Sequence, residues 1–254
     1  MSEKLSVLML FARSSIKRIC LTLFLMTVAE CGLFYFALHR FWEGITSGAI
    51  SLGTVIDRSN VFFVFVVAVA LLYTHLIDIA CEGGSHTGYT LRRLTISERQ
   101  VTLLHWWFIT GVLMIVWLFQ ALLALGLCMW YLKICPAELV NHQTLVLAFY
   151  RTNFLHNLLP MADMWCWVRN VALAVVAGIW MANSARGVRW GKKVGFGTYL
   201  ILWLVVLAFT WSSGHSATRD IGVTMLCGLI LFFGLVVLWK GEDEDEEEQP
   251  EAQV

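Results

Sequence analysis

Three ionisable side chains on one helix face are the first candidates for chemistry. His75, Asp78 and Glu82 follow the spacing i, i+3 and i+7, which places them on the same side of a helix. Imidazole and carboxylate groups bind metal ions, but a stable site needs more ligands held in a fixed geometry. We therefore favour a hydrated polar helix end or a contact with a partner, and we predict no metal site.

Glu30 and Arg169 are the second candidates, because each lies in or beside a long apolar run. Glu30 falls near the middle of the run 19–38, where an ionisable group is costly and usually faces a cavity or another polar group. Two interpretations stay open. The two residues could line a substrate path, or they could form a structural polar pair with each other.

The sequence carries no recognisable nucleotide-binding or catalytic motif. The segment 187–193 has two glycines and two lysines, but its glycine spacing is too short for a phosphate-binding loop and no Ser or Thr follows the lysines. Signatures of a Ser-His-Asp triad, a zinc protease or a paired-aspartate intramembrane enzyme are also absent. We expect no enzyme activity of its own, so any ATP hydrolysis must take place on another polypeptide.

The polar stretch 80–105 separates two apolar runs and contains Arg92, Arg93 and Arg99. Short loops rich in Lys and Arg are retained in the cytoplasm. Thr95 and Glu98 have the T-x-x-E spacing of a capping box, which predicts a helix start near Thr95. The residues 90–94 before it are long enough for about one helical turn. A short surface helix that contacts a partner and an ordinary loop at the headgroups are both compatible with this pattern.

The order of residues in this loop resembles the cytoplasmic coupling segment of type 2 ABC exporter permeases (the ABC-2 type). The residues that carry the resemblance are Glu82, Gly88, Thr90, Leu91, Leu94, Ile96, Ser97, Arg99 and Gln100. The chain departs from the family in having Thr95 where proline is common, and Arg92 and Arg93 where the interior is usually more apolar. The resemblance implies a contact with a separate ATPase through Glu82, Tyr89, Leu91, Arg92, Arg93 and Leu94. It implies no directly bound cofactor, with ATP and Mg²⁺ on that ATPase.

The composition is that of an integral membrane protein. Hydrophobic residues make up 59% of the 254 residues and charged residues only 14%, and mean hydropathy is +0.72. A soluble domain is far more polar. Apolar runs of about 20 residues, the length that crosses a bilayer, occupy most of the chain. We predict six spans at about 19–38, 61–80, 101–132, 168–183, 194–211 and 221–239.

The segments outside the spans each have an expected role. Residues 1–18 mix basic and apolar side chains, which predicts an interfacial helix on the inner surface. Residues 39–60 form an outer loop, and 133–167 are predicted to form an external or partly re-entrant helical hairpin. The acidic run within 241–254 predicts a disordered cytoplasmic tail. Cys135 and Cys166 are expected outside, where a disulfide between them is conceivable.

The distribution of positive charge orients this topology. Of the 18 Lys and Arg residues, six lie on the predicted outer side, namely Arg40, Arg58, Lys133, Arg151, Arg169 and Arg219. The other twelve lie on the inner side, which places both termini in the cytoplasm. Because membrane orientation explains the basic residues, they do not indicate nucleic-acid binding.

These observations predict an all-α, polytopic protein with one permease domain over residues 1–240. It has six transmembrane helices, an N-terminal interfacial helix and a cytoplasmic coupling helix. The resemblance implies a bacterial plasma-membrane exporter whose partners are ATPase subunits, the bilayer and a second identical or different permease subunit, with a peptide, lipid or drug-like cargo. An ion-coupled secondary transporter and a non-transporting scaffold or sensor are the alternatives.

Overall fold

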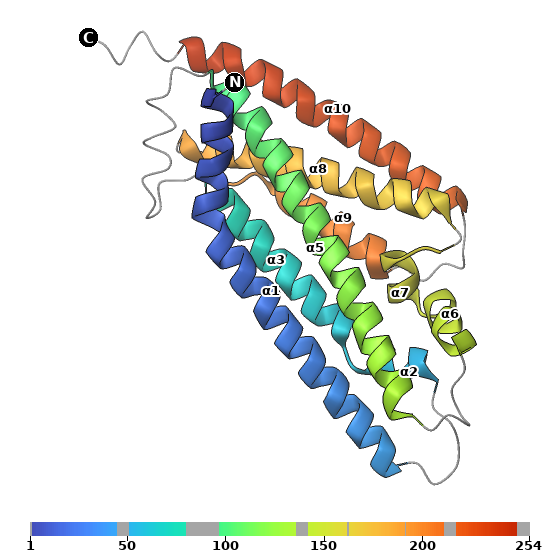
Figure 1. Ribbon diagram of the computed structural model, residues 1–254. Coiled ribbons are helices and arrows are strands. Elements are labelled where there is room, and N and C mark those ends of the chain that lie inside the picture. The colour runs from blue at the N-terminus through green and yellow to red at the C-terminus, as the bar shows by residue number, and fades with distance from the viewer. Residues whose placement is uncertain are drawn as a thin grey trace.

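The computed structural model describes residues 2–44, 51–79, 97–135, 142–161, 163–190, 192–210 and 217–247. These residues form helices and connecting turns, with no strand among them. Figure 1 shows the helices gathered into one elongated bundle. The helices are α1 (Ser2–Gly44), α2 (Leu52–Arg58), α3 (Val61–Asp78), α5 (Glu98–Ile134), α6 (His142–Arg151), α7 (Asn153–Leu158), α8 (Met164–Arg189), α9 (Phe196–Thr210) and α10 (Ala217–Glu247).

Five helices are long and apolar enough to cross a membrane, which indicates a multi-pass membrane protein. Their membrane-length segments are Leu5–Arg40, Val61–Asp78, Glu98–Ile134, Met164–Arg189 and Ala217–Lys240. The sixth predicted span, 194–211, coincides with α9, which has 15 residues. Such a helix is about 22 Å long, less than the roughly 30 Å of a hydrocarbon core. Five spans are therefore supported by length and composition, and α9 is a shorter apolar helix.

The first helix differs from the predicted interfacial helix followed by a separate span. α1 runs without a break for 43 residues, and Figure 1 shows its first turns inclined to the rest. The hydroxyls of Ser14 and Ser15 donate to the carbonyl oxygen of Phe11, at 3.2 and 2.7 Å. Hydroxyls that bond back onto the preceding turn bend a helix without ending it. The change of direction therefore lies within one helix.

The bundle is centred on α5 and α8, which pack closely together. α5 also contacts α1, and α8 also contacts α10, α9 and α3. A Cβ atom added at Gly178 of α8 would collide with the Thr110 hydroxyl and come within 3.0 Å of Trp106, both on α5. A small residue at this position lets two membrane helices approach closely. α5 has 37 residues and is therefore longer than the roughly 20 residues that a helix needs to cross the hydrocarbon core.

Side-chain hydrogen bonds attach α9 to its neighbours. The Tyr73 hydroxyl on α3 donates to the Thr198 carbonyl oxygen at 2.6 Å, and the hydroxyls of Ser184 on α8 and Thr198 are hydrogen-bonded to each other. Tyr73 and Thr198 are each 1% exposed. Polar bonds of this kind hold a short apolar helix in the bundle, because no water is available there to replace them.

The predicted outer region contains three short helices. Residues 39–60 were expected to form only a loop, but 52–58 form α2, whose N-cap Ser51 accepts a hydrogen bond from the Thr54 amide. The helical pair predicted within 133–167 is present as α6 and α7, which contact each other. α6 also contacts α2, and α7 contacts α9. These helices cover one end of the bundle in Figure 1.

The last helix extends into the acidic run. α10 continues to Glu247, whereas the sequence predicted that a disordered tail begins at residue 241. Glutamate is a good helix former, so the helix passes the charge boundary despite repulsion between neighbouring carboxylates. Residues 248–254 of the predicted tail lie outside the described part of the chain. Figure 1 shows the end of α10 and the start of α1 at the same end of the bundle.

Candidate functional site

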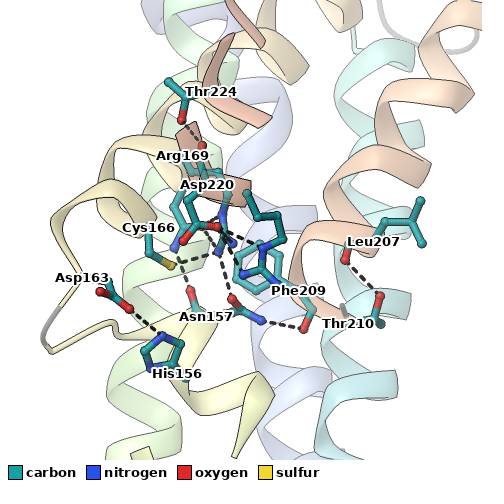
Figure 2. Close-up of polar contacts among 12 residues, drawn as sticks. His156, Asn157, Asp163, Cys166, Arg169, Leu207, Phe209, Thr210, Asp220 and Thr224 are labelled. Atoms are coloured by element: carbon teal, nitrogen blue, oxygen red, sulfur yellow. Dashed lines mark hydrogen bonds and ion pairs between the residues drawn. The ribbon is translucent and has the colours of Figure 1, made fainter. Parts of the chain in front are cut away.

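A buried arginine lies at the centre of the most extensive polar network. Arg169 on α8 is 1% exposed and is the largest fully buried side chain among the described residues. Its Nη1 donates to Asp220 Oδ1 at 2.7 Å. Its Nη2 donates to Asn157 Oδ1 at 3.1 Å and to Asn170 Oδ1 at 3.0 Å. Nη2 also lies 3.0 Å from the Cys166 sulfur. Figure 2 shows Asp220, Asn157 and Cys166 gathered around the guanidinium.

The helical repeat explains how the network forms. Cys166, Arg169 and Asn170 are spaced i, i+3 and i+4 on α8 and therefore share one face. Asp220 lies in the first turn of α10, where the exposed amides of a helix start stabilise a carboxylate. Arg219 adds a second cation, with Nη2 at 3.2 Å from Asp220 Oδ1. The carboxylate thus meets two guanidinium groups and a helix start.

Asparagine side chains extend the network to two further helices. Asn170 Nδ2 donates to the Asn157 carbonyl oxygen at 2.7 Å, and Asn157 Nδ2 donates to the Phe209 carbonyl oxygen at 3.3 Å. Asn157 belongs to α7 and Phe209 to the last turn of α9. The network consequently joins α7, α8, α9 and α10 at one end of the bundle (Figure 2).

This arrangement is suited to holding helices rather than to proton transfer. Arg169 is 1% exposed and Asp220 is 3% exposed, so water has little access to either group. Separating the pair would leave an uncompensated buried charge, which costs about 3 to 5 kcal/mol. The network therefore fixes how α8 and α10 pack, and relative motion of the two helices at this end is strongly resisted.

An apolar cavity adjoins the network. It has a volume of about 60 Å³ and is enclosed by side chains of α3, α5, α8 and α9, with Asn170 at one edge. Drug-sized ligands occupy pockets of about 300 to 1,000 Å³. The cavity is too small for such a ligand in the conformation described, so it does not form a substrate site by itself.

Glu30 and Arg169 do not form the pair that the sequence suggested. Glu30 on α1 is 0% exposed, and its Oε2 accepts a hydrogen bond from Gln120 Nε2 on α5 at 3.0 Å. Arg169 is instead compensated by Asp220. The sequence suggested this pair because both charges are costly in a membrane. In the structure Glu30 contacts Gln120 and Arg169 contacts Asp220. Glu30 Oε1 has no hydrogen-bond partner in the described part of the protein.

A third polar contact lies where α5 begins. Arg189, in the last turn of α8, approaches Glu98 Oε1 to 2.6 Å with Nη2 and 2.8 Å with Nε. Its Nη2 also donates to Thr102 Oγ1 at 3.4 Å. The Arg189 side chain is 2% exposed and that of Glu98 is 24% exposed. The start of α5 is therefore fixed to the end of α8.

The helix starts at Glu98 rather than near Thr95, and Thr95, the hydroxyl of the predicted capping box, lies outside the described residues. α5 begins at Glu98 after the N-cap Ser97, whose side chain makes no capping hydrogen bond. The Glu98 carboxylate turns to Arg189, a charged partner that binds it more strongly than a backbone amide. The contact residues Glu82, Tyr89, Leu91, Arg92, Arg93 and Leu94 all lie outside the described residues, so their predicted role stays a prediction.

The three ionisable residues on one helix face, His75, Asp78 and Glu82, do not form a described cluster. Arg18 Nη1 donates to His75 Nδ1 at 3.0 Å, Asp78 is exposed, and Glu82 is outside the described residues. No group of three or more metal-binding side chains occurs within the described ranges.

The two cysteines that were predicted to lie outside differ in exposure and are not bonded to each other. Cys135 and Cys166 are both free thiols, and Cys166 is 0% exposed beside Arg169. The two thiols therefore do not form the disulfide that the sequence allowed, and burial keeps Cys166 from reagents in water, while the external position of both residues stays a prediction.

Several residues of these networks were not found from the sequence. Asp220, Asn157 and Gln120 were not singled out. Gln120 could have been found, since an amide in the middle of a long apolar run needs a partner. Asn157 carries no comparable signal because its neighbours are mixed in polarity.

Comparisons with known proteins add no assignment. No protein-family model matches the chain, and no curated protein or solved structure matches it.

Proposed function

We propose that this chain is the membrane-spanning subunit of an ATP-driven exporter. Two such subunits, identical or different, would assemble with separate ATPase subunits that bind ATP and Mg²⁺. The five membrane-length helices, the shorter α9 between the fourth and fifth of them, and the loop sequence between α3 and α5 support this proposal. The cargo belongs to the peptide, lipid or drug-like class that the sequence resemblance implies.

The observation that carries the proposal is the ion pair between Glu98 and Arg189. Residues 82–100 would contact the ATPase, and Glu98 is the first residue of α5 after that contact. Its carboxylate lies 2.6 Å from Arg189 Nη2, at the end of α8. A displacement of the loop would therefore reach the two central helices of the bundle together. Coupling needs such a connected element between the site of ATP hydrolysis and the transport path.

The test compares a loop variant with a variant of the ion pair. The full chain is purified from membranes of its own organism with co-purifying ATPase, and transport-stimulated ATP hydrolysis is measured in nanodiscs. We expect Leu91→Ser with Leu94→Ser to lose the ATPase, because two anchoring leucines contribute most of such a contact. Glu98→Gln should retain the ATPase but lower stimulated hydrolysis several-fold.

The matched control is Leu91→Met with Leu94→Met, which keeps the apolar surface and should retain the ATPase. All variants must elute as the parent does in size-exclusion chromatography. A serine double variant that binds ATPase and transports normally would contradict the proposal.

An ion-coupled transporter is the second candidate, favoured by the unpaired Oε1 of Glu30 in the middle of α1. A carboxyl group buried in a membrane protein can bind and release a proton, and such groups form proton relays in transporters. The same purification separates the two candidates. Transport by the chain without any ATPase, lost in Glu30→Gln, would favour ion coupling.

A further inference from the structure

A basic hollow opens between three helices at the end of the bundle where α8 ends. It has a volume of about 600 Å³ and is bounded by the last turns of α8, the start of α9 and the far part of α10. Four cationic side chains line it: Arg186, Lys192, Lys193 and Lys240. No carboxylate is among its described lining residues. The hollow therefore has a strongly positive interior suited to an anion.

The depth of the hollow matches the headgroup layer of a membrane. The membrane-length segment of α8 ends at Arg189, and that of α10 ends at Lys240. The cations therefore lie where the apolar helix surfaces give way to water. The indole of Trp190, an amphipathic group typical of membrane interfaces, also lines the hollow.

The other wall of the hollow is apolar. It is formed by Trp180 on α8 and by Phe233, Val236 and Val237 on α10. Phe233 is 59% exposed and Val237 is 45% exposed, so this wall continues onto the outer surface of α10. A ligand with an anionic head and a hydrocarbon tail could contact the cations and the apolar wall at once.

The guanidinium of Arg186 is held in place at the boundary between the two walls. Its Nη1 donates to the Leu238 carbonyl oxygen at 3.2 Å and its Nη2 to the Val237 carbonyl oxygen at 3.5 Å. These bonds spare the arginine the entropic cost of becoming ordered when a ligand binds. Lys193 and Lys240 are exposed and can turn towards the same phosphate.

We propose that this hollow binds the phosphate headgroup of an anionic phospholipid, with one acyl chain lying against Phe233 and Val237. Basic pockets between membrane helices bind phosphorylated headgroups through the attraction of several nearby cations. The concentration of Lys and Arg at this end also orients it towards the cytoplasmic leaflet, where anionic lipids are enriched. This site is independent of the exporter proposal.

The experiment measures binding of phosphatidylglycerol to the purified full chain. The protein is titrated with phosphatidylglycerol or phosphatidylcholine in detergent, and bound lipid is counted by native mass spectrometry. We expect one tightly bound phosphatidylglycerol and no comparable phosphatidylcholine. Lys193→Gln with Lys240→Gln should weaken the affinity about thirtyfold, because each lysine near anionic lipid contributes about 1 kcal/mol, which is about a fivefold factor in affinity.

The matched control is Arg13→Gln with Lys17→Gln, which removes the same charge from exposed positions on α1 that do not line the hollow. Its affinity should stay within about twofold of the parent if the pocket, rather than net charge, binds the lipid. Equal weakening in both double variants would overturn the proposal. Equal binding of both lipids would also overturn it.

Two further arms exclude other occupants. Millimolar inorganic phosphate should not displace the lipid, because it lacks the acyl contact; full displacement would make this a soluble-phosphate site and overturn the proposal. Truncation after Gly241 should leave the affinity unchanged. A large gain in affinity on truncation would show that the acidic run, and not a lipid, occupies the hollow.

Discussion

At the scale of single residues, the strongest constraint on the bundle is the charge of Arg169. Its guanidinium is 1% exposed, yet it has acceptors on α7, α8 and α10. Replacing a whole buried ion pair by apolar groups is often neutral, whereas removing one partner is strongly destabilising. The two kinds of change at this site should therefore have very different effects.

Asp220→Asn tests this difference. The variant leaves the Arg169 charge without a carboxylate, so we expect the free energy of unfolding to fall by about 3 to 5 kcal/mol. Unfolding is followed in detergent micelles by loss of helical circular dichroism during titration with a denaturing detergent. Asp78→Asn, at an exposed carboxylate, should change stability by less than about 0.5 kcal/mol.

A double variant, Arg169→Met with Asp220→Leu, should recover much of the lost stability, because both buried charges are then removed and Arg219, the other cation at Asp220, has a side chain that is 20% exposed. Equal stability of Asp220→Asn and Asp78→Asn would show that the pair does not hold α8 to α10.

The sequence indicates which residues need partners more readily than which partners they find. Glu30 and Arg169 were selected because isolated charges are costly in a membrane. The partner of Arg169 lies 51 positions along the chain, and nothing local in the sequence distinguishes Asp220 from other turn residues. Gln120 is 90 positions from Glu30. Such contacts depend on which helices pack against each other. The local sequence around one residue does not show this.

At the scale of helices, glycines set the spacing of the central pair and of α8 with α10. A Cβ at Gly178 would collide with Thr110 on α5, and a Cβ at Gly234 would lie 3.0 Å from Ile179 on α8. By contrast, Gly126 on α5 has no neighbouring atom within 4 Å of an added Cβ. The close approach of neighbouring helices, rather than backbone flexibility, explains why glycine occupies positions 178 and 234.

Gly178→Ala and Gly126→Ala should consequently change stability in opposite directions. Alanine favours a helix by up to about 1 kcal/mol over glycine, so Gly126→Ala should be neutral or stabilising. Gly178→Ala forces α5 and α8 apart, and overpacking of this kind costs about 1 to 3 kcal/mol. Denaturing-detergent titrations of the two proteins provide the comparison. Stabilisation by both substitutions would show that α5 and α8 are not in close contact there.

The apolar runs predicted the existence of the long helices but not their ends. The run 168–183 is part of α8, which extends over Met164–Arg189, because the residues beyond both ends of the run include good helix formers such as Met, Ala and Arg. The same effect joins residues 1–18 to the first span in α1 and carries α10 to Glu247. α9 differs from its prediction in the opposite direction. Its apolar composition predicted a membrane span, but its 15 residues are too few to cross the hydrocarbon core without help.

At the scale of the whole molecule, the two ends of the bundle differ in how many Lys and Arg residues they hold, although the acidic run that ends α10 lies at the end richer in them. The end of α8 carries Arg186 and Arg189, and Lys192 and Lys193 follow it. α1 begins and α10 ends at this same end in Figure 1. The opposite end holds α6, α7 and the start of α8. Because basic flanks are retained in the cytoplasm, we expect the basic end to face inwards and Met161, in the connection from α7 to α8, to face outwards.

Labelling of single cysteines in intact cells tests this orientation. Each cysteine is placed in a chain whose seven native cysteines have been replaced, and an impermeant maleimide is added outside. Met161→Cys should react, because Met161 is 56% exposed and lies at the outer end. Ser85→Cys should react only after the membrane is permeabilised. A chain that keeps Cys166 alone should stay unlabelled until it is denatured, because that thiol is 0% exposed wherever the bundle faces. Cys166 thus serves as a control for burial, because its lack of labelling does not depend on the side of the membrane. Labelling of Ser85→Cys but not of Met161→Cys in intact cells would show that the protein has the opposite orientation in the membrane.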